Sequence, residues 1–171
     1  YSFFSLYANV DKFNYSEAEV PMEKRPEIDR WIISLLNTLV KEVTEYYETY
    51  EPTRAGRAIS DFVGENLSNW YVRLNRKRYW GGEYDEDKIS AYQTLYTCLE
   101  TVAHLMAPIA PFFADRLFLD LNAVTGKDKS ESVHLAKFPT FNESLIDSNL
   151  ETCMQLAQQT SSLILALRRK A

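Results

Sequence analysis

Residues that break helices are scarce in this sequence, which has 5 glycines and 6 prolines among 171 residues. A β-sandwich or barrel needs many tight turns and usually more of both residue types. Long helices need few of either. This scarcity argues against an all-β fold and favours a helical one. Apolar residues make up 46% of the chain, which is enough to build a sizeable core.

Cysteines and long apolar runs are scarce as well. Cys98 and Cys153 are the two cysteines and form no C-x-x-C pair, so neither a zinc site nor a disulfide framework follows from them. We expect both to be small buried residues in a reducing compartment. No stretch approaches the roughly 20 apolar residues that span a membrane, and no secretory signal is evident. The sequence therefore predicts a cytoplasmic protein without a membrane partner.

The residue groupings of an active site are missing too. The sequence shows no glycine-rich phosphate loop, no Ser/His/Asp set and no paired carboxylates. His104 and His134 lie far apart in the sequence and lack accompanying ligands, which favours structural roles for both. We expect no catalytic residue, no metal and no cofactor in this chain.

Apolar residues recur at spacings of three or four, as at Trp31, Leu35 and Leu39, which is typical of amphipathic helices. Pro26 and Pro52 suit first helical turns. The predicted helices cover residues 1–13, 26–50, 52–80, 86–107, 111–124 and 148–169. Residues 132–138 are predicted to form a short extended segment. The fold class is therefore all-α, a bundle of five to six helices in a single domain over residues 1–171.

Two features concern the ends of the chain. Ser148 and Glu151 have the spacing of a capping box, which predicts that the Ser148 side chain caps the last helix and that the Glu151 carboxylate reaches back to it. The chain begins with Tyr1, inside an aromatic run, and not with Met. We therefore expect it to be part of a longer protein.

Charge is distributed unevenly. The net charge of −5 argues, on average, against a dedicated nucleic-acid binder, and we expect no DNA partner. Residues 69–80, with the sequence NWYVRLNRKRYW, nevertheless concentrate four cations in one short helical stretch. On a helical wheel of about 100° per residue, this stretch and the residues before it divide into two faces. The predicted core stripe consists of Val63, Leu67, Trp70 and Leu74. The predicted exposed arc consists of Asn69, Arg73, Arg76, Lys77 and Trp80, with Arg78 as a flanking charge.

The exposed arc suits RNA. Cations neutralise phosphates and release counterions. An Asn side chain can hydrogen-bond a base edge, and indole and guanidinium planes can stack on unpaired bases. The sequence therefore predicts an RNA-binding face on this arc.

Two other interpretations of residues 69–80 stay open. The basic face could be solvated and paired with Glu83, Asp85 and Glu86, and cations near a helix C-terminus also favour the helix dipole. Alternatively, the aromatic residues near Tyr79 and Trp80 could anchor a protein partner. At the N-terminus, Phe3, Phe4 and Tyr7 could form a domain–domain interface.

Several segments resemble the anticodon-binding domain of isoleucyl-tRNA synthetases, in the family's order and over nearly the whole chain. They are FFSLYANVDKF at residues 3–13, DRW at 29–31, LSNWYVR at 67–73 followed by RKRYW at 76–80, LMAPIAPF at 105–112 and SVHL at 132–135. The combination indicates the isoleucine enzyme over its valine and leucine relatives, whose corresponding domain is the alternative. Many family members carry Arg-Ser where this chain has Leu74 and Asn75.

The resemblance implies a helical bundle that holds the anticodon stem-loop of tRNA-Ile and that adjoins catalytic and C-terminal domains of a parent chain. The parent would be an ATP-dependent ligase that requires magnesium and joins isoleucine to tRNA. The family's ATP-site signatures, His-Ile-Gly-His and Lys-Met-Ser-Lys-Ser, do not occur in this sequence. The resemblance therefore implies that this piece binds tRNA and does not catalyse.

Overall fold

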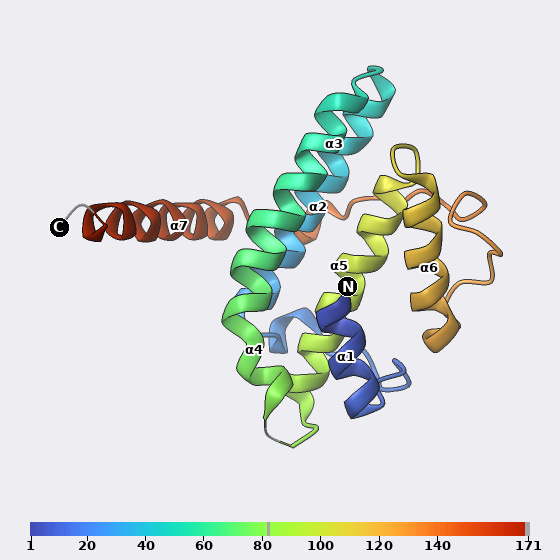
Figure 1. Cartoon of the computed structure of the whole chain (residues 1–171), viewed down its shortest axis with the longest axis horizontal. Coiled ribbons are helices and arrows are strands. Elements are labelled where there is room, and N and C mark those ends of the chain that lie inside the picture. The colour runs from blue at the N-terminus through green and yellow to red at the C-terminus, as the bar shows by residue number, and fades with distance from the viewer. Residues whose placement is uncertain (82, 170–171) are drawn as a thin grey trace.

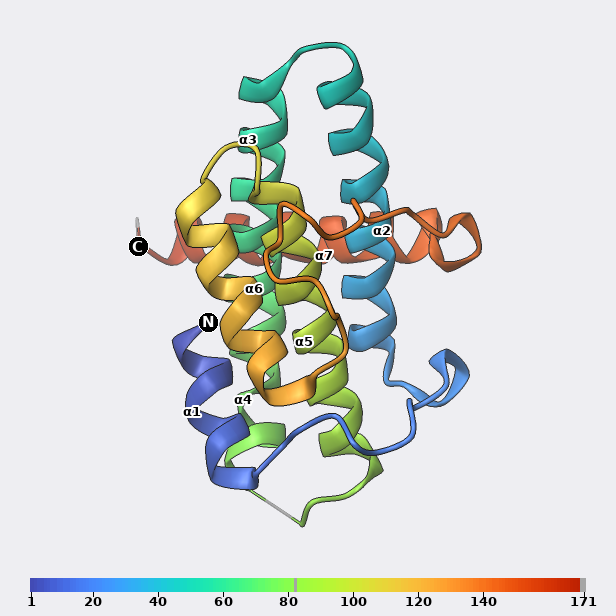
Figure 2. The same cartoon turned by 90° about the vertical axis from the view of Figure 1, so that its right-hand side faces the viewer.

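The computed structural model describes residues 1–81 and 83–169 and confirms an all-α bundle, without a strand in that part of the chain. Its largest feature is a pair of long antiparallel helical arms (Figures 1 and 2). One arm is α2 (Glu27–Glu48). The other arm is a continuous helical rod made of α3 (Pro52–Asp61), the π-helix η2 (Phe62–Val72) and α4 (Arg73–Trp80).

A second pair packs beside the first. It consists of α5 (Glu86–Met106) and α6 (Pro111–Thr125), and α1 (Ser2–Asp11) lies against α5. Short 3-10 turns, η1 (Met22–Lys24) and η3 (Glu143–Leu145), lie in the connectors. The last helix, α7 (Ser148–Arg168), contacts α2 and then projects away from the bundle (Figure 1). None of the described helices is long and apolar enough to cross a membrane.

Local sequence explains where the helices begin and end. Pro52 and Pro111 occupy the first turns of α3 and α6, where proline's missing N–H costs nothing. The Asp85 carboxylate accepts a 2.9 Å hydrogen bond from the Lys88 N–H and caps α5. Gly126 ends α6 with a φ of 59°, a left-handed conformation that glycine adopts without strain.

The cap of the last helix differs from the prediction. Asp147, one residue earlier, caps α7 by accepting a 3.0 Å hydrogen bond from the Leu150 N–H. The Glu151 carboxylate accepts hydrogen bonds from the Ser34 and Thr38 hydroxyls of α2 and does not reach back along its own helix. The capping-box prediction was wrong because a tertiary contact with α2 takes the carboxylate that the local motif needs.

The predicted extended segment at residues 132–138 is also wrong, because its first part forms turns. The Leu135 and Ala136 N–H groups donate to the carbonyls of Ser132 and Val133. The Asp115 carboxylate of α6 accepts from the Ser132 hydroxyl and the Val133 N–H, which fixes the turn against the bundle. Val133 is buried there.

The π-helix shifts the core stripe of the rod. The buried positions are Phe62, Leu67, Tyr71, Asn75 and Tyr79, a step of five followed by steps of four. In a π-helix each N–H donates to the carbonyl five residues earlier. The buried position therefore moves about one residue further along the chain with each turn than it does in an α-helix. The predicted core residue Leu74 is therefore 55% exposed, and its neighbour Asn75 is buried.

This shift predicts opposite sensitivities at two adjacent positions. Leu74→Gln is expected to change the free energy of unfolding by no more than about 0.5 kcal/mol, because it is a surface substitution. Asn75→Ala is expected to cost about 1–3 kcal/mol, because it leaves the partners of a buried amide unsatisfied. Urea denaturation of both variants measures the difference. A larger loss for Leu74→Gln than for Asn75→Ala would contradict the shifted stripe.

Aromatic residues of the N-terminal helix belong to the core. Phe4 is buried, and the Phe3 ring packs edge-on against Tyr79 with a centroid distance of 5.1 Å. The expected exposure of Phe4 is therefore wrong, and Phe3 and Tyr7 are partly buried against the core of this domain. Of the two cysteines, Cys98 is buried as expected, whereas Cys153 is exposed on α7.

Candidate nucleic-acid interface

The arc predicted from the sequence forms one exposed face of the rod. Arg73, Arg76, Lys77 and Trp80 follow the i, i+3, i+4, i+7 spacing of α4, and all are exposed. Trp80 is 58% exposed, so a large indole faces solvent. Asn69 lies on the preceding π-helix, is exposed, and its side chain donates a 3.4 Å hydrogen bond to Glu65.

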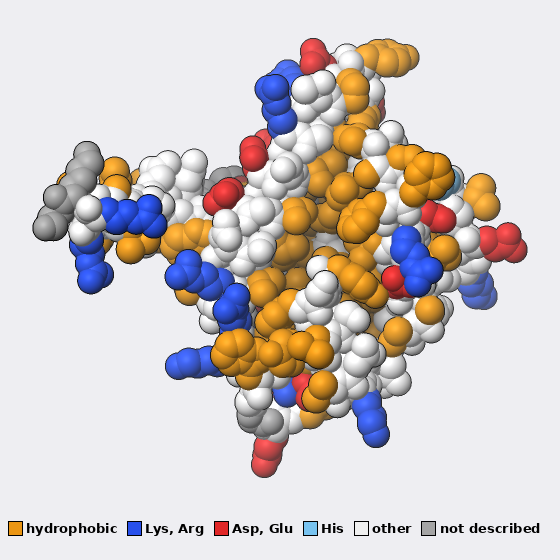
Figure 3. Space-filling model, in the orientation of Figure 1, with side chains coloured by type: hydrophobic (Ala, Val, Ile, Leu, Met, Phe, Trp, Pro, Cys, Tyr) orange, Lys and Arg blue, Asp and Glu red, His pale blue; other side chains and the backbone are white. Residues whose placement is uncertain are grey.

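The cations of this face remain available for a ligand. Within residues 1–81 and 83–169, Arg73, Arg76 and Lys77 form no ion pair. Two acids expected to neutralise them have other partners: Asp85 caps α5, and Glu86 pairs with Lys24 at 3.4 Å. Lys and Arg side chains gather along the edge of the molecule where α4 runs, beside exposed apolar side chains (Figure 3). A solvated face paired with local acids therefore does not describe these three cations.

Arg78 occupies a different place from the other cations of this stretch. Its guanidinium forms ion pairs with Asp29 at 2.7 Å and Asp87 at 2.8 Å, and its side chain is only 14% exposed. Burial disfavours the charge, but the hydrogen bonds and negative charge of Asp29 outweigh it and raise the pKa of Arg78. Arg78, expected as a flanking RNA contact, is thus engaged inside the protein and holds α4 in place.

Asp29 is the centre of a buried polar cluster that sequence reasoning missed. Its side chain is fully buried and also accepts hydrogen bonds from the Tyr71 hydroxyl at 2.8 Å and the Ser90 hydroxyl at 2.6 Å. Asn75 joins the cluster by accepting a 3.0 Å hydrogen bond from Arg78. The cluster fastens α2, η2, α4 and α5 together directly behind the basic face. A charged residue on the apolar side of a predicted helix, between Ile28 and Ile32, was the available signal.

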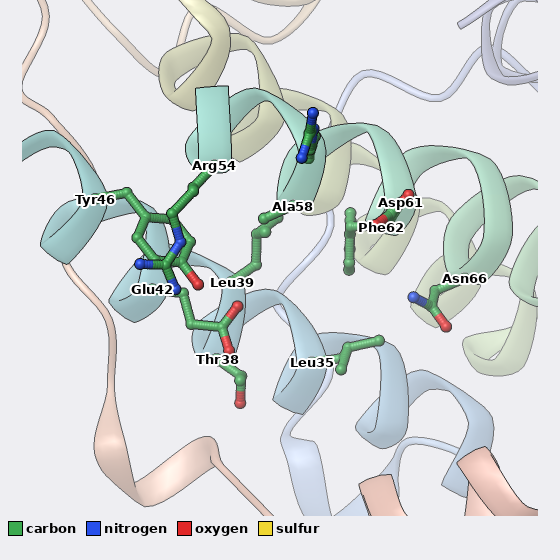
Figure 4. A pocket seen from close by; sticks show the side chains of 11 residues that line it. Leu35, Thr38, Leu39, Glu42, Tyr46, Arg54, Ala58, Asp61, Phe62 and Asn66 are labelled. Carbon is green, nitrogen blue, oxygen red and sulfur yellow. The ribbon is translucent and has the colours of Figure 1, made fainter. Parts of the chain in front are cut away.

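A groove of about 470 Å³ runs between α2 and the α3–η2 part of the rod (Figure 4). Arg54 lies 4.5 Å from the ring centroid of Tyr46, a cation–π contact. Glu42 lies beside them, and partial burial, followed by the charge of Glu151, raises the pKa of its carboxyl group. Arg57 and Asp61 also line the groove. Its charges of both signs favour neither an anion nor a cation, so this groove is a weaker site for RNA than the basic face.

A second groove, of about 600 Å³, lies between η2 and α7. Trp70, predicted as a core residue, lines it in a half-buried position. The other lining residues are Glu65, Gln155, Gln158, Gln159, Ser162 and Leu163. The Gln158 amide donates a 3.1 Å hydrogen bond to Asn66, which ties α7 to the rod at this point.

A helical bundle with an unneutralised basic and aromatic face on one rod has the form of a helical RNA-binding module. A family model described as the anticodon-binding domain of tRNA ligase matches residues 29–171. The chain belongs to this family of anticodon-binding domains, as its motifs indicated.

The similar proteins identify the branch of the family. The chain is 71% identical over 170 residues to the isoleucine–tRNA ligase of Bacteroides fragilis, covering 99% of this chain and 15% of that protein. It is 63% identical to the isoleucine–tRNA ligase of Cytophaga hutchinsonii, with the same coverage. It is 49% identical to that of Dehalococcoides mccartyi, covering the whole chain and 17% of the relative. The chain thus spans about 15% of the length of the curated relatives it matches most strongly.

Proposed function

We propose that the exposed face formed by Asn69, Arg73, Arg76, Lys77 and Trp80 binds the anticodon stem-loop of tRNA-Ile. The observation that carries this proposal is that three cations, which form no ion pair with the described residues, share a face of the rod with one exposed indole in an otherwise acidic chain. Arg78 contributes indirectly, because its ion pair with Asp29 fixes the helix that presents this face.

The chemistry of the face divides into two parts. Arg73, Arg76 and Lys77 bind phosphates, which gives affinity and salt dependence but little base selectivity. Asn69 and Trp80 suit unpaired bases of the loop, through hydrogen bonding and stacking respectively. Leu74 and Asn75, where many family members carry Arg-Ser, add no charge to the face, since both side chains are neutral.

We propose that the parent protein is a cytoplasmic isoleucine–tRNA ligase, which uses ATP and magnesium in a separate catalytic domain. This chain then holds the anticodon arm while the acceptor end reaches that domain. The similarity to isoleucine–tRNA ligases over the whole chain supports this assignment over the valine and leucine relatives.

Another surface supports packing against the catalytic or C-terminal domain of the parent chain. An apolar groove of about 400 Å³ lies between the rod, α5 and α6. Hydrophobic side chains (orange) are exposed over these elements at the centre of Figure 3. Phe113 and Ile109 line the groove, and the nearby Phe112 is 91% exposed. Exposed apolar area of this kind marks protein interfaces. If a protein partner docks on this domain, this surface suits it better than the basic face does.

The test is the affinity of this domain for tRNA-Ile and for an unrelated tRNA, measured across a salt series. Salt-sensitive binding that prefers tRNA-Ile is the expected result. Equal, salt-sensitive binding to both tRNAs would make the face an electrostatic cradle and place selectivity elsewhere in the parent. Absence of binding at low salt would contradict the proposal and favour the protein-interface alternative.

A further inference from the structure

The groove between η2 and α7 has the chemistry of a nucleobase site. The half-buried Trp70 lines its η2 side, and Gln155, Gln158, Gln159 and Ser162 line its α7 side. Its volume of about 600 Å³ lies within the range of small-ligand sites, about 300–1,000 Å³. An aromatic plane beside neutral donors and acceptors matches the two things that an unpaired base presents, a π-face and a hydrogen-bonding edge.

The polar groups of the groove are available to a ligand, and one of them is held in place. The Gln158 amide is fixed by its 3.1 Å hydrogen bond to Asn66, which leaves its carbonyl oxygen to accept another. Gln155 and Gln159 are exposed and form no side-chain hydrogen bond with the described part of the chain. Among the described residues that line the groove, Glu65 is the charged one, and its carboxylate would repel a phosphate. The groove therefore selects a neutral base over the backbone of the RNA.

The groove is also continuous with the basic face. Asn69 belongs to that face and is the chain neighbour of Trp70, and its side chain donates to Glu65, which lines the groove. Arg73 lies three residues after Trp70 on the same rod, about one helical turn, so a strand whose phosphates lie on Arg73 runs close to the groove. An unpaired base turned out of this strand into the groove can stack on Trp70, a second aromatic plane besides the exposed Trp80 of the basic face.

We infer that this groove binds one unpaired nucleobase of the RNA loop, stacked on Trp70 and hydrogen-bonded by the α7 glutamines. The inference rests on the proposed function, and it adds a base-reading subsite to a face that otherwise binds phosphates. It also gives a role to α7, which has no buried residue and would be costly to order on packing alone.

The test uses the double variant Gln155→Ala/Gln159→Ala, whose exposed positions leave the fold intact, together with Trp70→Ala. Thr160→Ala, on an exposed position of α7 outside the groove lining, is the matched control. The probes are the anticodon stem-loop with all its loop bases and the same stem-loop made abasic at one loop position after another.

With the unchanged protein, one abasic position is expected to weaken binding about tenfold, within the range for stacking a base on an aromatic side chain. Both groove variants are expected to bind the complete loop about tenfold more weakly, to lose the preference for it over that abasic loop, and to keep the salt dependence. Thr160→Ala is expected to keep the preference. No abasic effect in the unchanged protein, or an unchanged preference in the glutamine variant, would overturn the inference.

Failure of the inference and failure of the proposed function give different results. If the basic face does not bind phosphates, the salt dependence does not change when Arg73 and Lys77 are replaced, whatever the abasic loops show. If only the groove is wrong, the salt dependence falls in that variant, and the abasic preference survives in the groove variants.

Discussion

Replacing Arg73 and Lys77 together by alanine is expected to weaken tRNA binding by roughly 100-fold at 50 mM salt. Each phosphate contact contributes about 0.7–0.9 to the slope of log affinity against log salt, so the slope is expected to fall by about 1.5. The effect is large because neither cation forms an ion pair in the described part of the chain, so both charges are available to phosphates. Affinities measured at several salt concentrations give both quantities.

The matched control is Arg116→Ala/Lys41→Ala, which removes the same net charge elsewhere. These cations pair with Asp120 at 3.0 Å and with Glu143 at 2.9 Å. The control is expected to keep most of the affinity and of the salt slope. If the two double variants behaved alike, net charge and not the face on α4 would govern binding.

Asp29→Ala is expected to lower the free energy of unfolding by about 3–5 kcal/mol. The substitution leaves the buried guanidinium of Arg78 with half of its acidic partners and leaves the Tyr71 and Ser90 hydroxyls without an acceptor. Removing one member of a buried ion pair is costly, because the remaining charge stays desolvated. Urea denaturation followed by circular dichroism measures the change.

Asp61→Ala provides the comparison for this variant. Asp61 is an exposed acid on the same rod and forms no ion pair among the described residues. Its replacement is expected to change stability by no more than about 0.5 kcal/mol. A loss below about 1 kcal/mol for Asp29→Ala would show that the cluster does not hold α2, η2, α4 and α5 together.

Much of the fold follows from local patterns in the sequence. The scarcity of glycine and proline and the spacing of residues such as Trp31 and Leu39 predicted an all-α bundle, which the structure confirms. Helix starts at Pro52 and Pro111 were predictable because proline is favoured in a first turn for reasons local to the backbone.

Features that depend on long-range contacts were not predictable. The wheel assumed a uniform α-helix, so it placed Leu74 in the core and overlooked Asn75. The π-helix between Phe62 and Val72 precedes both residues and changes which positions of the rod face the core. The position of Asp29 hinted at a buried charge, but its partner was hidden, because Arg78 lies 49 residues along the chain.

The candidate site, too, has a part that was predictable from local spacing and a part that depends on long-range contacts. Asn69, Arg73, Arg76, Lys77 and Trp80 were predicted together because they lie on neighbouring turns, and the structure places all five exposed on the rod. The helical wheel set Arg78 beside this arc as a flanking charge, but spacing could not show that it points inward, because its partner Asp29 lies on α2. The groove at Trp70 needs α7, whose place depends on hydrogen bonds from Ser34 and Thr38 to Glu151.

The most direct test of the account is a titration of the isotope-labelled domain with the anticodon stem-loop, followed by nuclear magnetic resonance. The account predicts that the largest shifts occur at residues 69–80, with the indole N–H of Trp80 among them, and that α6 changes little. Shifts concentrated on α6 around Phe112 and Phe113, with residues 69–80 unchanged, would contradict it.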